Sequence, residues 1–206
     1  MILEAPGDLD PSLKEFWVEN PWKIVRQGHN LSAFERNRTF LNVGGKHFID
    51  VSYLTSADSQ GDGRAVVAGD FRNTGQMDLA VRQIGGGPFL LFENRFPKRN
   101  YLKISLLGKD SNRLGIGARI VAHVGDLKIT REMFPVNSYQ SQAAAIVHIG
   151  LNKATKVDKL QIRWPSGEAY EFKNVHGNRH ILVREAHKLD STAITTVVPG
   201  QTMRLE

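Results

Sequence analysis

The fold is decided by the stretch ARIVAHVGDLKITRE, residues 118–132, in which apolar and polar side chains alternate. This period of two is typical of a half-buried β-strand, because successive side chains point to opposite faces of a sheet. The pair Gly125-Asp126 interrupts the alternation and fits a two-residue turn. The stretch therefore predicts two antiparallel strands whose buried side includes Ala118, Ile120, Ala122 and Val124.

The same alternation recurs before and after this hairpin. Its apolar members are Leu102, Ile104 and Leu106 on one side, and Leu160, Ile162 and Trp164 on the other. Shorter strands are expected at 146–149, 170–172 and 181–183, with a turn at Pro165-Ser166-Gly167. Seven or so strands without a long helix predict a β-sandwich, jelly-roll-like, over residues 99–186. The tail, residues 187–206, contains one more expected strand at 193–198.

Residues 37–98 also have the composition of β-structure. Glycine-rich turns separate short apolar runs, and Gly44-Gly45 between two such runs predicts a hairpin. We expect one antiparallel sheet of about four strands here. Residues 1–36 are expected to form a mostly irregular extension with a short helix at 10–17. The chain as a whole is therefore predicted to be all-β.

Composition excludes several classes of protein. The 206 residues contain no cysteine, which rules out disulfides, thiolate nucleophiles and iron–sulfur clusters. No apolar run reaches the roughly 18 residues of a membrane-spanning helix, so no transmembrane segment is expected. The start at Met1 lacks the basic and apolar regions of a secretory signal, which leaves a protein that stays inside or one whose signal has been removed.

Charge is distributed unevenly along the chain. Up to Lys98 there are 11 Lys and Arg against 12 Asp and Glu, whereas from Arg99 onward there are 16 against 9. A basic second half fits either an acidic partner or a solvated strand face on which Lys and Arg point outward. The basic residues are widely spaced and no aromatic platform lies among them, so a nucleic acid partner is not expected.

The second half resembles the ASPIC/UnbV domain over roughly residues 100–185. The resemblance is carried by Asn100-Tyr101-Leu102-Lys103, by Ser111-Asn112-Arg113-Leu114-Gly115-Ile116-Gly117-Ala118-Arg119, and by Trp164-Pro165-Ser166-Gly167, in that order. The stretch before it resembles a VCBS or FG-GAP repeat, one blade of an integrin-type β-propeller, through Gly61-Asp62-Gly63-Arg64, Gly69-Asp70-Phe71 and Asp78-Leu79. Both resemblances imply an extracytoplasmic protein, periplasmic or at the cell surface.

The blade resemblance implies a calcium loop of the form Asp-x-Asp-x-Asp-Gly-x-x-Asp. Asp70 and Asp78 keep its first and last positions, but Arg72 and Thr74 replace the two middle carboxylates. Asp70, Thr74 and Asp78 are thus the candidate metal ligands of a degenerate loop. We expect this loop to be empty, with Arg72 paired to one of the two carboxylates, and calcium is the alternative. No other cofactor is expected.

The polar loop at 110–117 is the candidate ligand-binding element. Asn112 and Arg113 either bind a sugar or peptide or hold the loop itself by hydrogen bonds, while the glycines supply positive φ angles. Tyr139 is the candidate exposed aromatic. Trp164 alternates with apolar neighbours, so a core position is expected for it in preference to a sugar-stacking one.

No catalytic motif is present, and no catalytic residue is assigned. His176 and His180 have a metal-like spacing, but the Gly177-Asn178 between them favours a turn and strands. The chain is expected to be a non-catalytic binding module, an accessory subunit docked on a larger, membrane-bound assembly of other protein subunits. The alternatives are a carbohydrate-binding module at the cell surface and a hydrolase with a Ser–His pair or convergent carboxylates.

Overall fold

A computed structural model describes residues 36–61, 63–83, 88–136, 138–186 and 193–198. Strands dominate this part of the chain, and its one short helix is α2 (Ser52–Thr55). The all-β prediction is confirmed. The predicted N-terminal helix at 10–17 lies outside the described residues.

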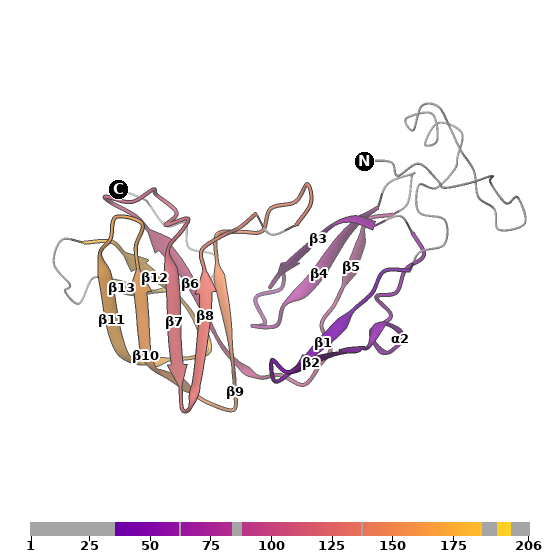
Figure 1. Cartoon of the computed structure of the whole chain (residues 1–206), viewed down its shortest axis with the longest axis horizontal. Helices are drawn as coiled ribbons and strands as arrows, with labels where there is room; N and C mark the ends of the chain where they lie inside the picture. The colour runs from indigo at the N-terminus through magenta and orange to yellow at the C-terminus, as the bar shows by residue number, and fades with distance from the viewer. Residues whose placement is uncertain (1–35, 62, 84–87, 137, 187–192, 199–206) are drawn as a thin grey trace, which may run out of the picture. The chain divides into compact units, whose positions relative to one another are not determined.

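Two four-stranded sheets form the β-sandwich (Figure 1). The first has the order β11-β10-β7-β8 and is antiparallel throughout; its strands are β7 (Arg119–Val124), β8 (Leu127–Glu132), β10 (Lys156–Arg163) and β11 (Ala169–His176). The second has the order β13-β12-β6-β9; its strands are β6 (Asn100–Leu107), β9 (Val147–Asn152), β12 (Arg179–Arg184) and β13 (Ile194–Val197). Its inner strands β6 and β12 run parallel, and its other pairs are antiparallel. The hairpin predicted across Gly125-Asp126 and the strand predicted in the tail are both confirmed.

One hydrophobic core lies between these sheets. Both contribute fully buried side chains to it, among them Leu102, Ile104, Ile120, Leu160, Ile162 and Trp164. Burying a side chain of this size is worth roughly 1.5–3 kcal/mol, so the core supplies most of the driving force for the sandwich. Trp164 is 2% exposed and meets Tyr170 edge-on, which confirms its predicted core position.

Residues 37–98 contain two smaller sheets where the sequence suggested one. β1 (Phe40–Val43) and β2 (His47–Asp50) form the hairpin predicted at Gly44-Gly45, whose two glycines have positive φ angles. β3 (Gly63–Gly69), β4 (Asp78–Gln83) and β5 (Leu90–Phe92) form a separate three-stranded sheet. Helix α2 intervenes between β2 and β3, and its first residue, Ser52, is buried and bonded to Asp50 and Thr39.

The chain divides into two compact units. One holds the described part of residues 1–66 together with 81–92, and the other holds residues 67–80 together with the described part of 93–206. The β3–β4 loop therefore belongs to the same unit as the sandwich, although sequence places it with the preceding strands. This grouping positions the loop's acidic residues against sandwich strands.

Candidate functional site

The β3–β4 loop and the start of β4 hold two of the candidate metal ligands, Asp70 and Asp78. Asp70 is nearly buried, and its carboxylate accepts hydrogen bonds from the backbone N–H groups of Thr74, at 2.7 Å, and Gly75, at 2.9 Å. Gly75 has a φ of 84°, a left-handed conformation that side chains rarely adopt. Asp78 is 2% exposed and accepts a bond from the backbone of Asn94. The loop thus orients two buried carboxylates.

Each of these carboxylates is paired with a cationic side chain. Lys103, on β6, places its Nζ 2.8 Å from Asp70 Oδ2 and 3.3 Å from Asn73 Oδ1. Arg72 donates from Nε and Nη2 to the two oxygens of Asp78, at 3.2 and 3.0 Å. Burial raises the pKa of Asp70, but the bonds from Lys103 and the loop N–H groups outweigh this and hold it below its ordinary value. Arg72 lowers the pKa of Asp78.

The residues present do not fit a calcium ion. Thr74 uses its hydroxyl within the loop, 3.4 Å from Asp70 Oδ1, and contributes no anionic ligand. A divalent ion about 4 Å from either cationic group would meet a repulsion of about 8 kcal/mol at an effective dielectric constant of 20. The described residues include no group of three His, Cys, Asp or Glu suited to a metal. The predicted pairing of Arg72 is present, whereas the role of Lys103 was missed because it lies 33 residues from Asp70.

The loop at 108–117 is held from inside by Glu185, which sequence reasoning did not select. This carboxylate is 5% exposed and accepts the backbone N–H groups of residues 109, 110 and 111, at 2.7 to 3.0 Å. The hydroxyls of Ser111 and Ser166 donate to its other oxygen. Burial raises the pKa of Glu185, but these bonds dominate and lower it to about 2. Glu185 therefore joins the Ser111 loop to the turn after Trp164.

The predicted ligand-binding residues have different surroundings. Asn112 exchanges two hydrogen bonds with the backbone of Ile116, at 2.7 and 2.8 Å, so its amide shapes the loop. Arg113 is exposed, and its side chain forms no ion pair with a residue that the structure describes. Tyr139 is 67% exposed. No hydrogen bond or ion pair among the described residues joins Tyr139 to Asn112 or Arg113.

A serine and a histidine meet on the outer face of the second sheet. Ser105 Oγ lies 2.8 Å from His180 Nε2, across the parallel pair β6–β12. Burial lowers the pKa of His180, and the positive charge of Lys103 lowers it further. No described carboxylate hydrogen-bonds to His180, and Ser105 stands inside a strand, not on a turn that exposes the hydroxyl.

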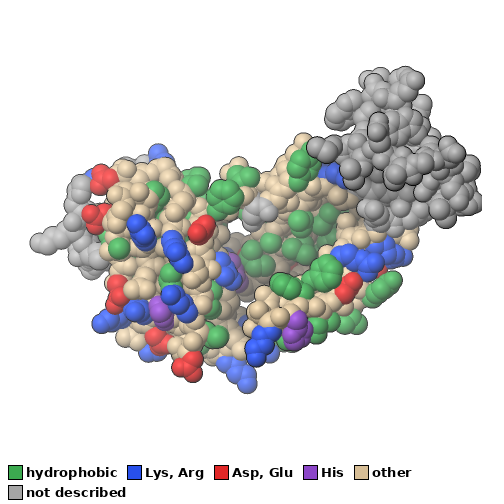
Figure 2. Space-filling model, viewed as in Figure 1, with side chains coloured by type: hydrophobic (Ala, Val, Ile, Leu, Met, Phe, Trp, Pro, Cys, Tyr) green, Lys and Arg blue, Asp and Glu red, His purple; other side chains and the backbone are tan. Residues whose placement is uncertain are grey.

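The outer face of the first sheet is basic. In one row across the sheet, register places Lys128 beside His123, His123 beside Lys159, and Lys159 beside Lys173. Two rows further along the sheet Arg119 lies opposite Arg163, with Glu132 on its other side, and the row between contains Glu171. None of these five cationic side chains forms an ion pair with a described residue, and Figure 2 shows blue side chains across this face. We call these five residues the basic face.

The comparisons with known proteins concern part of the chain. Residues 108–190 match the family model described as ASPIC and UnbV, and this segment contains the whole Glu185 network. No curated protein matches the chain. Within the described residues, no helix has both the length and the apolar character needed to cross a bilayer.

Proposed function

We propose that this chain is a non-catalytic interaction module, an accessory subunit that docks on a larger protein assembly through its basic face. The observation that supports this proposal is that Lys159 lies directly opposite Lys173, and Arg163 opposite Arg119. None of these four side chains forms an ion pair with a described residue. Like charges opposite one another destabilise a sheet. An acidic partner surface would relieve this repulsion and speed docking by long-range attraction.

The absence of catalysis is part of the proposal. A hydrolase would need an activated nucleophile, an orienting group for its base and a place for a developing oxyanion. The Ser105–His180 pair supplies only the contact between a hydroxyl and a histidine. Burial and the positive charge of Lys103 disfavour the protonated histidine that such a mechanism requires. A hydrogen bond that satisfies two polar groups on a sheet face accounts for the pair.

The resemblance of residues 37–98 to a VCBS or FG-GAP blade supports an extracytoplasmic location, periplasmic or at the cell surface. In this region Phe48 is 67% exposed on β2 and Leu54 is 85% exposed on α2. Apolar side chains exposed this far favour a second protein contact. The proposed module works without calcium, because Lys103 and Arg72 already neutralise the two carboxylates of its loop.

The test is a charge reversal on the basic face in the assembly purified from the native source. Lys159→Glu with Lys173→Glu should release the chain from its partners, whereas Lys46→Glu with Arg82→Glu, two exposed cations elsewhere, should not. Raising the salt concentration should release the unaltered chain, since exposed charges are screened. A basic-face variant that stays bound, or an unaltered chain that is a partnerless monomer by mass measurement, would contradict the proposal.

A further inference from the structure

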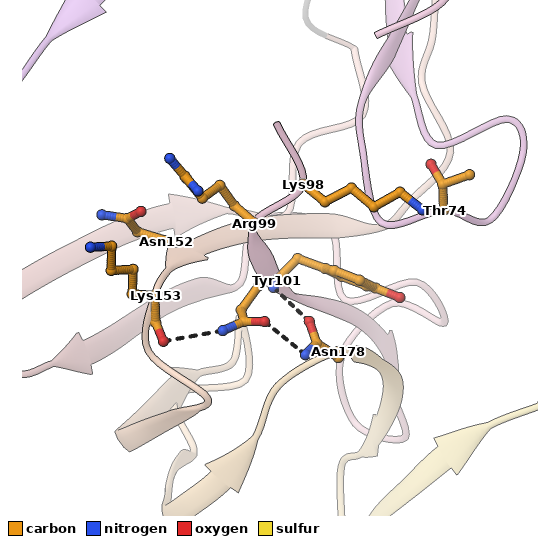
Figure 3. A pocket seen from close by; sticks show the side chains of 8 residues that line it. Thr74, Lys98, Arg99, Tyr101, Asn152, Lys153 and Asn178 are labelled. Atoms are coloured by element: carbon orange, nitrogen blue, oxygen red, sulfur yellow. Dashed lines mark hydrogen bonds between the residues drawn. The ribbon is translucent and has the colours of Figure 1, made fainter. Parts of the chain in front are cut away.

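A pocket of about 530 Å³ lies at one end of the second sheet (Figure 3). Small-molecule sites in proteins commonly span about 300–1,000 Å³, so the size suits a ligand of one or two rings. Four separate segments line it: the β3–β4 loop, the start of β6, the turn after β9, and the turn between β11 and β12. The lining residues are Thr74, Lys98, Arg99, Asn100, Tyr101, Asn152, Lys153 and Asn178.

The pocket carries three positive charges and no negative one. Its cations are Lys98, Arg99 and Lys153, and none of its lining residues is acidic. None of the three makes an ion pair with a residue that the structure describes. In Figure 3 Lys98 extends toward Thr74, while Lys153 lies on the other side of Tyr101. A concave surface lined by one sign of charge concentrates ligands of the opposite sign.

Two of the three asparagines in the pocket have carboxamides that hydrogen bonds hold in place. Asn178 Nδ2 donates to Asn100 Oδ1 at 2.9 Å, and Asn100 Nδ2 donates to the carbonyl of Lys153 at 3.2 Å. The carboxamide oxygen of Asn178 also accepts the backbone N–H of Tyr101, at 3.3 Å. Since each carboxamide has two N–H donors, both donating amides keep one for a ligand.

Two further groups are available to a ligand. The hydroxyl of Tyr101 and the carboxamide of Asn152 form no hydrogen bond with any residue that the structure describes. Tyr101 itself is held in place, because its ring stacks on His148 at a centroid distance of 5.7 Å. Each of these two groups can both donate and accept a hydrogen bond, which suits the hydroxyls of a sugar ring.

We propose that this pocket binds an acidic sugar, a pyranose ring that carries a carboxylate. The three cations account for the carboxylate, with Arg99 able to bind it through two parallel N–H groups. The amides and the Tyr101 hydroxyl account for ring hydroxyls. A neutral sugar would leave the three cations without an anionic partner. A simple inorganic anion would leave the amide groups without ring hydroxyls to bind.

The test is calorimetric titration of the full chain with three probes: trigalacturonate, its fully methyl-esterified form, and inorganic phosphate. Trigalacturonate should bind, and both other probes should bind at least about tenfold more weakly. Lys98→Gln with Lys153→Gln should weaken trigalacturonate binding by about tenfold or more. The matched control, Lys128→Gln with Lys159→Gln on the basic face, should leave it unchanged.

Three results would overturn the inference. They are no binding of trigalacturonate, equal binding of the ester or of phosphate, and a loss of binding caused by the control pair and not by the pocket pair. Tyr101→Phe removes only one hydroxyl and should weaken binding while the thermal midpoint stays close to that of the unaltered chain. The basic face and the pocket share no residue, so this outcome is independent of the proposed docking.

Discussion

The side-chain nitrogen of Lys103 lies 2.8 Å from Asp70 Oδ2, so a residue of strand β6 neutralises the first carboxylate of the β3–β4 loop. Both groups are nearly buried, with side-chain exposures of 10% and 4%. A covalently attached ammonium group therefore takes the charge-balancing role that a bound ion has in a calcium loop.

Replacing this lysine should destabilise the protein strongly. Lys103→Met is expected to lower the free energy of unfolding by about 3 kcal/mol, because it leaves the buried carboxylate of Asp70 without its cation. Adding Asp70→Asn should restore part of the loss, since the remaining charge is removed. Urea denaturation of the three variants measures this coupling. Losses that simply add would contradict a direct interaction.

The loop should be insensitive to calcium until its cations are removed. We expect calcium and a chelator to leave the thermal midpoint of the unaltered chain unchanged. The triple variant Arg72→Asp, Thr74→Asp and Lys103→Met should have a midpoint that rises with calcium, because it replaces two cations and adds two carboxylate ligands. Differential scanning calorimetry checks both statements, and stabilisation of the unaltered chain by calcium would refute the first.

Glu185 should make stability depend on acidity. Its pKa is about 2 in the folded protein against 4.5 in a free side chain, which corresponds to about 3 kcal/mol of stability above pH 4.5. A lowered pKa means that this stability is lost as the pH falls from about 4.5 toward 2.

The variant Glu185→Gln isolates this effect. It should be much less stable than the unaltered chain at pH 7, and the difference should shrink as the pH falls through that range. Denaturant unfolding at several pH values provides the measurement. A gap that stays constant with pH would show that the carboxylate charge contributes nothing.

Ser105 should contribute to stability only, through its hydrogen bond with His180. Ser105→Ala is expected to cost about 1 kcal/mol, the value of one hydrogen bond, here the one with His180. A fluorophosphonate, which labels activated serines, should leave Ser105 unmodified. Labelling of Ser105 that disappears when His180 is replaced by alanine would instead identify a nucleophile and contradict the non-catalytic proposal.

Local patterns in the sequence predicted the strands and turns well. Neighbours within a few residues were enough to predict three features: the hairpin at Gly125-Asp126, the turn after Trp164 and the burial of Trp164. The contacts that define the sites depend on distant ones. Lys103 meets Asp70 from 33 positions away, and Glu185 meets the loop at 109–111 from 74 to 76 positions away.

Local sequence patterns could not predict the pocket either. Its lining comes from four segments that only the folded sheets bring together, and no one segment shows a motif. Asn178 did leave a trace, because the Gly177-Asn178 pair indicated a turn and asparagine tolerates the left-handed backbone that Asn178 adopts. That trace indicates a turn and carries no information about a ligand.

The parallel pairing of β6 with β12 has a consequence for synthesis of the protein. Residues 100–107 must wait until residues 179–184 have left the ribosome before their sheet can be completed. During that interval one edge of β6 lacks its native backbone partner, and exposed strand edges invite pairing with other chains. The nascent polypeptide therefore keeps an exposed strand edge until its last strands emerge, and a pause in translation before residue 179 would prolong that exposure.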